Sequence, residues 1–302
     1  MQHGARQERT AAATHRKGDA ARLSVVSNTT LVAMKLAAGA ISGSVSIIAE
    51  ALHSGLDLVA AMIAWFSVRA ADLPPDDKHP YGHGKLENVS GTIEAALILV
   101  TAVWIGREAW GRLVHPLPVR ASALGLSAMA ISAGVNVLVS RRLFRVAKAE
   151  NSIALEADAH HLSVDVYTSV GVFVGLLLIQ ITGWHVLDGV IAMLLALAIG
   201  HIAWDLTHRA AQPLLDTRLP EAEETSLVAL IQEDPRVVDC HAVRSRTAGG
   251  QAFLDAHVSV SPGTTLEDAD ILEEDLRARL QRENPRLDVM LHVEPAARGG
   301  GP

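Results

Sequence analysis

Residues 158–184 read DAHHLSVDVYTSVGVFVGLLLIQITGW, and this stretch decides the fold. Its second part, residues 166–184, contains no charged side chain, and a membrane-spanning helix needs about 20 mostly apolar residues. Its first part carries Asp158, His161 and Asp165. Ionisable side chains in a membrane helix are costly, and those that occur usually line a polar path or a binding site. The stretch therefore predicts a transmembrane helix with a polar site in its first half.

Five further segments have the length and apolar character of membrane spans. Residues 121–140 carry no charge at all. Four others contain isolated ionisable groups: 23–41 with Lys35, 46–68 with Glu50, His53 and Asp57, 89–105 with Glu94, and 187–202 with Asp188. The sequence therefore predicts a bundle of six transmembrane helices over residues 23–212.

The flanks and loops of this bundle indicate its orientation. Residues 1–22 are polar and basic without an apolar core, so they predict a disordered or frayed tail and no cleaved signal peptide. Lysine and arginine are more frequent in this tail and in the loops on the same side than in the opposite loops. Such residues concentrate on the cytoplasmic side. We therefore expect a protein of the cell (inner) membrane with both termini in the cytoplasm.

The C-terminal part has a different composition. Residues 213–302 hold 17 Asp/Glu and 9 Lys/Arg, whereas residues 1–212 hold 16 and 17. Apolar spacing predicts helices at 221–232 and 266–282 and strands at 237–243, 252–260 and 287–292. This order indicates a small α+β domain over residues 213–295, followed by a disordered tail at 296–302. The absence of a basic excess argues against a nucleic-acid binder. Because Cys240 is the only cysteine in the sequence, the chain is not a disulfide scaffold.

Two matched motifs of the form acid-x-x-His-x-x-x-Asp lie in the second and fifth spans. Side chains four residues apart share one face of a helix, so each span offers an imidazole and a carboxylate to the bundle interior. Four such groups suit a tetrahedral Zn²⁺ site; they are His53, Asp57, His161 and Asp165. The alternative is a set of structural interhelical pairs. One turn earlier, Glu50 and Asp158 are either supporting groups or solvated helix ends.

Two more clusters outside the spans contain metal-ligating residue types. The loop after the second span offers Asp76, His79 and His83, which either converge on a metal or remain solvated. The C-terminal domain offers His241, His257 and His292 on separate predicted strands, with Asp270 and Glu294 nearby in sequence. These histidines either meet at one edge of the sheet or lie apart on its surface.

Taken together, these motifs resemble those of the cation diffusion facilitator family, over about residues 23 to 295. The resemblance rests on the paired motifs, on DKHPYGHGKLE at 77–87, on LLD at 214–216 and on HVEP at 292–295. It implies a divalent metal/proton antiporter whose transport site is formed by the two paired motifs. It also implies a metal site in the loop and a regulatory zinc site in a metallochaperone-like, dimerising C-terminal domain. Lys85 and Asp216 match a charge pair that joins protomers in this family.

The ligand types bear on the transported ion and on its driving force. Imidazole with carboxylate suits Zn²⁺, and Co²⁺, Cd²⁺ or Fe²⁺ are alternatives. Metal binding requires neutral imidazole and ionised carboxylate and therefore releases protons. The sequence thus predicts a homodimeric efflux transporter that exchanges cytoplasmic zinc for protons by alternating access, and no enzyme activity. The alternative is a membrane metal sensor or scaffold that does not transport, whereas no HExxH motif supports a metalloprotease.

Overall fold

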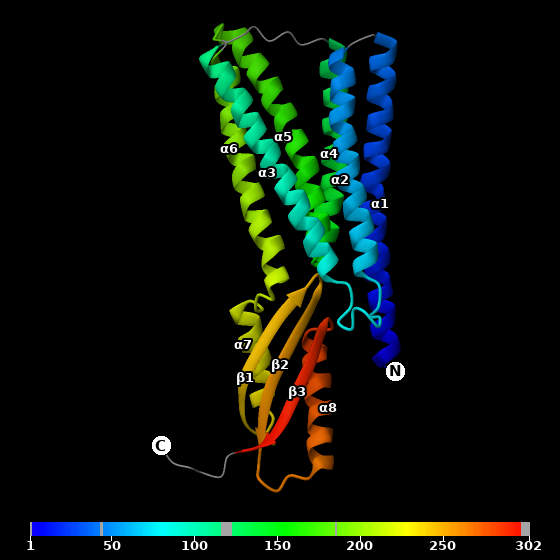
Figure 1. Ribbon diagram of the computed structural model, residues 1–302, viewed down its shortest axis with the longest axis vertical. Coiled ribbons are helices and arrows are strands. Elements are labelled where there is room, and N and C mark those ends of the chain that lie inside the picture. The colour runs from blue at the N-terminus through cyan, green and yellow to red at the C-terminus, as the bar shows by residue number, and fades with distance from the viewer. Residues whose placement is uncertain (1, 43–44, 116–122, 185, 297–302) are drawn as a thin grey trace. The chain divides into compact units, whose positions relative to one another are not determined.

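The computed structural model describes residues 2–42, 45–115, 123–184 and 186–296 (Figure 1). The chain divides into two compact units, of which one is Gln7–Ala211 and the other consists mainly of Gln212–Pro302. We describe each unit by itself. The tail expected at 296–302 lies, from residue 297 onward, outside the described residues.

The first unit is built from six long helices. Ser152 caps the start of the fifth helix by accepting a hydrogen bond from the Leu155 amide, and Gly183, at φ 74°, ends it. Glycine adopts this left-handed conformation without steric cost. The bounds are α1 Gln2–Ser42, α2 Val45–Ala71, α3 Lys85–Val114, α4 Ala123–Glu150, α5 Ile153–Thr182 and α6 Val186–Ala211.

Five helices of the described residues are long and apolar enough to cross a membrane, by length and composition. The expected span at 121–140 is not among them, and its first two residues lie outside the described part of the chain. The five stretches are Ala13–Ile41, Ser54–Ala71, Lys85–Val114, Ile153–Thr182 and Val186–Leu215. A helical transmembrane unit is thereby confirmed.

The N-terminal segment differs from the expectation. Residues 1–22 were predicted to be disordered, but the structure places them, from Gln2 on, in α1. Lys17 is buried, and its Nζ lies 2.5 Å from Asp72 Oδ1 and 2.7 Å from Glu87 Oε1. Arg16 pairs with Glu150 at 2.7 Å. Ala20 and Ala21 pack in a buried apolar cluster with α2, α4 and α5, and the ion pairs of Arg16 and Lys17 with other elements add to this packing. These contacts are distant in sequence, so the sequence of the segment alone does not reveal them.

Two apolar clusters hold the helices together. One joins α1, α2, α4 and α5 around Leu143, Leu155 and Leu162. The other joins α3, α5 and α6 around Ile98 and Ile199, and Figure 1 shows α3, α5 and α6 running alongside one another. Small residues allow this close approach, which is typical of membrane helices.

Gly189 of α6 illustrates the close approach. A Cβ atom there would lie 2.9 Å from the Leu113 side chain and 3.0 Å from the Leu113 backbone nitrogen. Any larger residue would therefore push α6 away from α3.

The second unit is the predicted α+β domain. Its elements are α7 Glu221–Gln232, β1 Val237–Ala248, β2 Gln251–Val260, α8 Leu266–Glu283 and β3 Leu287–Pro295. The sheet order is β1-β2-β3, with β1 antiparallel and β3 parallel to the central strand. Side chains of α7 and α8, including Leu227 and Leu276, form one core with Leu254, Val258 and Leu291 of the sheet. The helices therefore cover one face, and alternate residues of the strands lie on the other.

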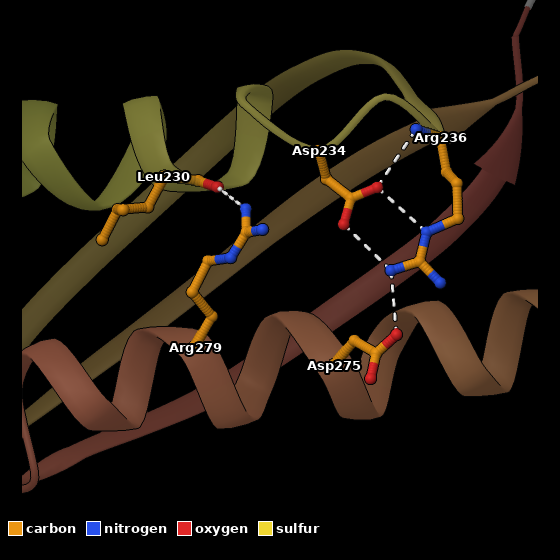
Figure 2. Close-up of polar contacts among 5 residues, drawn as sticks. All are labelled: Leu230, Asp234, Arg236, Asp275 and Arg279. Carbon is orange, nitrogen blue, oxygen red and sulfur yellow. Dashed lines mark hydrogen bonds and ion pairs between the residues drawn. The ribbon is translucent and has the colours of Figure 1, made fainter.

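A polar bridge ties α7, β1 and α8 together at one end of this domain (Figure 2). Arg236 donates to both oxygens of Asp234 at 2.9 Å, and its Nη2 also reaches Asp275 at 2.9 Å. Arg279 of α8 donates to the Leu230 carbonyl at 3.1 Å. The guanidinium hydrogen bonds lower the pKa of Asp234 to about 2. The bridge therefore holds both helices to the start of the sheet.

Candidate metal centres

The paired motifs place their ligands between α2 and α5. Asp57 of α2 is buried, and its Oδ1 lies 3.0 Å from Nε2 of His161 on α5. Asp165 follows one turn after His161 on the same face of α5. The side chain of His53 lies outside the described residues, so its position stays a prediction. We call the four residues His53, Asp57, His161 and Asp165 the membrane centre.

Asn136 of α4 is a neighbour of the membrane centre that the sequence did not indicate. Its Nδ2 donates to Asp165 Oδ2 at 3.2 Å, and the side chain is buried. Sequence inspection missed it because the span 121–140 was searched for charges, and asparagine has none. A polar side chain within an apolar span was the available signal. Asn136 holds the Asp165 carboxylate in one orientation, as residues that support metal ligands do.

Two further carboxylates lie next to the membrane centre. Asp158 of α5 and Glu94 of α3 are fully buried, at 1% and 0% exposure. Asp158 is within electrostatic range of both His161 and Asp57. The side chain of Glu50, the matching residue on α2, lies outside the described residues. The sequence marked Glu94 as a charge within a span, but only the tertiary structure brings it near Asp158.

The loop between α2 and α3 brings its three candidate ligands together. His79 Nδ1 lies 3.1 Å from Asp76 Oδ1, and His83 Nε2 lies 3.4 Å from Asp76 Oδ2 and 3.1 Å from His79 Nδ1. Gly82, at φ 81°, makes the turn between the histidines. The amide groups of His79 and Lys78 lower the pKa of Asp76. One carboxylate and two imidazoles thus converge, as a metal site requires.

The three histidines of the C-terminal domain lie in one row across the sheet. His257 of β2 pairs in register with His241 of β1 and with His292 of β3. All three are on the face that α7 and α8 leave open. Glu294 Oε1 lies 3.2 Å from His241 Nε2, and its Oε2 lies 3.5 Å from His257 Nδ1 and 3.8 Å from His292 Nε2. The glutamate is therefore the common neighbour of all three imidazoles.

One predicted ligand, Asp270, is not brought to this row. Asp270 is exposed on α8, and that helix covers the opposite face of the sheet. In the described part of this domain, the ligand atoms that lie close enough together to hold one metal ion belong to His241, His257 and Glu294. Asp216 forms an ion pair with Arg246 at 3.4 Å, within its own unit. Its expected pairing with Lys85, the first residue of α3, is between protomers and stays a prediction.

Known proteins with similar sequences cover nearly the whole chain. Residues 21–215 match the model of the cation efflux transmembrane domain, and residues 219–296 match that of the cation efflux protein cytoplasmic domain. An uncharacterized transporter of Synechocystis is 36% identical over 278 residues, covering 90% of this chain and 88% of the relative. The cation-efflux pump FieF of Shewanella oneidensis is 32% identical over 276 residues, covering 91% and 93%.

Among the solved structures that are similar to part of the chain is a zinc form of a protein described as the putative zinc transporter CzrB. It is 32% identical and covers 28% of this chain and 99% of the solved one, with a TM-score of 0.27. The two family models and the full-length relatives identify the family. The chain belongs to the cation diffusion facilitator family and is a cation efflux transporter.

Proposed function

We propose that this transporter exports a divalent metal ion, zinc above all, from the cytoplasm in exchange for protons. The observation that carries the proposal is the buried contact of 3.0 Å between His161 of α5 and Asp57 of α2. A nitrogen and an oxygen donor from two helices meet there, with Asp165 one turn away. Zinc accepts such mixed ligands in tetrahedral sites. Co²⁺, Cd²⁺ and Fe²⁺ accept similar donors and are the alternative substrates.

Proton exchange follows from the chemistry of the same two residues. A proton on the His161 imidazole strengthens its hydrogen bond to the Asp57 carboxylate. A metal ion requires the imidazole to be neutral, so binding the ion displaces the proton. The site then opens to the other side of the membrane, where a returning proton weakens metal binding. This cycle is alternating access with His161 as a proton carrier.

The two remaining clusters lie outside the spans and serve other steps in our proposal. The loop ligands Asp76, His79 and His83 bind a metal at the cytoplasmic surface. The histidine row with Glu294 binds a regulatory zinc ion in the cytoplasmic domain, through which two copies of the chain form a homodimer. The protein lies in the inner membrane with both termini in the cytoplasm, and Lys85 of one protomer pairs with Asp216 of the other.

Zinc flux in proteoliposomes under an imposed pH gradient tests the proposal. We expect His161→Ala and Asp57→Asn each to abolish zinc uptake and the accompanying proton movement. His160→Ala is the matched control, because His160 contacts Phe144 and Glu156 rather than the membrane centre. Wild-type flux in the His161→Ala variant would contradict the proposal. Zinc binding without flux in the wild-type protein would favour the sensor or scaffold.

A further inference from the structure

Two buried carboxylates outside the membrane centre have no part in the mechanism above. Glu94 of α3 is 0% exposed and Asp158 of α5 is 1% exposed. Their neighbours in sequence, Ala95 and Ala157, pack in one buried cluster between α3 and α5, which places the two carboxylates near one another. Such a pair is unusual in a membrane helix bundle, where even one ionisable group is costly.

The oxygens of this pair have unused bonding capacity. Ser90 Oγ donates to Glu94 Oε1 at 3.3 Å. Glu94 Oε2 has no hydrogen-bond partner among the described residues. Asp158 is contacted by the buried hydroxyl of Ser24 on α1. Buried ionised carboxylates require a compensating positive charge or a proton. The arrangement therefore offers oxygen atoms to a cation.

The position of the pair along the helices suggests when a cation would occupy it. Asp158 lies one turn before His161 and close to Ile153, where α5 begins. Glu94 lies in the third turn of α3, which begins at Lys85. Both residues therefore lie between the membrane centre and the helix ends that our proposed function places in the cytoplasm. The Asp158 carboxylate interacts electrostatically with Asp57 and His161 of the membrane centre.

We propose that Glu94 and Asp158, with the hydroxyls of Ser24 and Ser90, form a second cation site, the inner carboxylate site. It holds the divalent ion between the cytoplasm and the membrane centre, so this inference rests on the proposed function. Two carboxylates balance the charge of one divalent cation. Oxygen ligands suit Mn²⁺ better than imidazole-containing sites do. The site binds zinc more weakly than the membrane centre, as a transit site must if the ion is to leave it.

Mn²⁺ binding followed by electron paramagnetic resonance tests the site directly. The probe is Mn²⁺ alone, added to the full-length protein in nanodiscs. The background variant removes the other centres by Asp57→Asn, His161→Ala, His83→Ala and His257→Ala. We expect this background variant to bind one Mn²⁺ per protomer. Adding Glu94→Gln to the background variant should abolish the binding. Glu108→Gln is the matched control, because Glu108 is a carboxylate of the same helix with a 62% exposed side chain.

Zinc flux through Glu94→Gln, with all other residues intact, provides the second measurement. We expect its KM for zinc to rise several-fold, while Glu108→Gln transports like the wild type. Unchanged Mn²⁺ binding in Glu94→Gln would overturn the site. If that variant also loses the infrared band of a protonated carboxyl group while it keeps Mn²⁺, Glu94 carries a proton rather than a cation. If Glu94→Gln does not fold, Asp158→Asn carries the same test. Mn²⁺ binding is measured without transport, so the two proposals can fail separately. If His161→Ala still transports zinc, the proposed function is overturned, whereas the Mn²⁺ measurement still decides whether the inner carboxylate site exists.

Discussion

Asn136 shows how one uncharged side chain can orient a metal ligand. Its amide holds one oxygen of Asp165 at 3.2 Å and leaves the other carboxylate oxygen for different interactions. A carboxylate held in one orientation loses less conformational freedom when it binds an ion. If the membrane centre binds the transported ion as we propose, its affinity therefore depends on α4 as well as on the helices that carry the ligands.

We predict that Asn136→Ala weakens zinc binding during transport. Loss of a hydrogen bond that supports a metal ligand costs about 10-fold or more in affinity, so the KM for zinc flux should rise by about that factor. Ser132→Ala is the matched control, because Ser132 is buried one turn earlier on α4 and its hydroxyl has no partner among the described residues. An unchanged KM in Asn136→Ala would show that Asp165 needs no support from α4.

Asp234 gives the C-terminal domain a defined acid sensitivity. Its pKa is about 2 in the folded domain, against a usual 3.8, because the Arg236 guanidinium donates two hydrogen bonds to it and the Arg236 amide a third. A carboxylate whose pKa is lowered by folding stabilises the folded state above its ordinary pKa. That contribution disappears as the pH falls through the folded-state value. The bridge drawn in Figure 2 should therefore lose its stabilising effect on the folded domain as the pH falls from about 4 to about 2.

We predict that Asp234→Asn removes this part of the pH dependence. The wild-type domain should lose about 1 to 2 kcal/mol of stability between pH 4 and pH 2 through this group, since Arg236 is partly exposed to solvent. Hydrogen exchange of the strand amides in the full-length protein, followed as a function of pH, measures this loss of stability. Asp288→Asn is the control, because Asp288 is an exposed carboxylate of β3 in the same domain. Equal pH slopes in the wild type and Asp234→Asn would refute the prediction.

At the scale of elements, buried ion pairs act together with apolar packing to hold residues 16–21 of α1. Lys17 lies between Asp72, just after α2, and Glu87 in the first turn of α3. Glu87 also accepts a hydrogen bond of 2.5 Å from Ser152, which caps α5. One buried cation thus connects α1 to the ends of three other helices. Removing one member of such a network leaves buried charges without compensation.

We predict that Lys17→Met destabilises the membrane unit by about 3 to 5 kcal/mol, the usual cost of breaking a buried ion pair. Unfolding of the detergent-solubilised protein, followed by tryptophan fluorescence, measures this loss. Lys148→Met, at an exposed lysine of α4, is the control. The double variant Lys17→Met/Glu87→Gln should recover part of the stability because it removes one of the uncompensated charges. A disordered N-terminal segment would instead leave all these variants equally stable.

At the scale of the whole molecule, charge is separated between the units. Residues 213–302 hold 17 acidic and 9 basic side chains, so two C-terminal domains repel one another at neutral pH. In the regulation that we propose, a cation bound by Glu294 and the histidine row reduces that repulsion. Because the row lies on the face of the sheet that the helices leave open, the bound metal would then favour contact with a second copy of the chain, and the zinc concentration would control association of the domains.

We predict that zinc increases cross-linking between C-terminal domains of the full-length dimer and that EDTA reverses the increase. His257→Ala should abolish the response, because His257 lies in register with both other histidines. His201→Ala, at an exposed histidine of α6, should leave the response intact. Zinc-independent cross-linking in the wild-type protein would contradict regulation by this row.

Much of the architecture could be predicted from local patterns. Apolar runs specified the helices of the membrane unit, and alternation specified the α-β-β-α-β order, because both depend on neighbours in sequence. The spacing of His161 and Asp165 placed both on one face of a helix. The N-terminal segment was predicted incorrectly because Lys17 is ordered by Asp72 and Glu87, which are distant in sequence.

The sequence by itself determined most of the helices and strands, the shared face of each His-x-x-x-Asp pair and the residue types of three candidate metal centres. Only the tertiary structure decided that Asp57 contacts His161, that Asn136 supports Asp165 and that Glu94 approaches Asp158. It also placed Asp270 away from the histidine row. The reason is physical: helical and strand periodicity are local, whereas contacts between elements depend on how all of them pack at once.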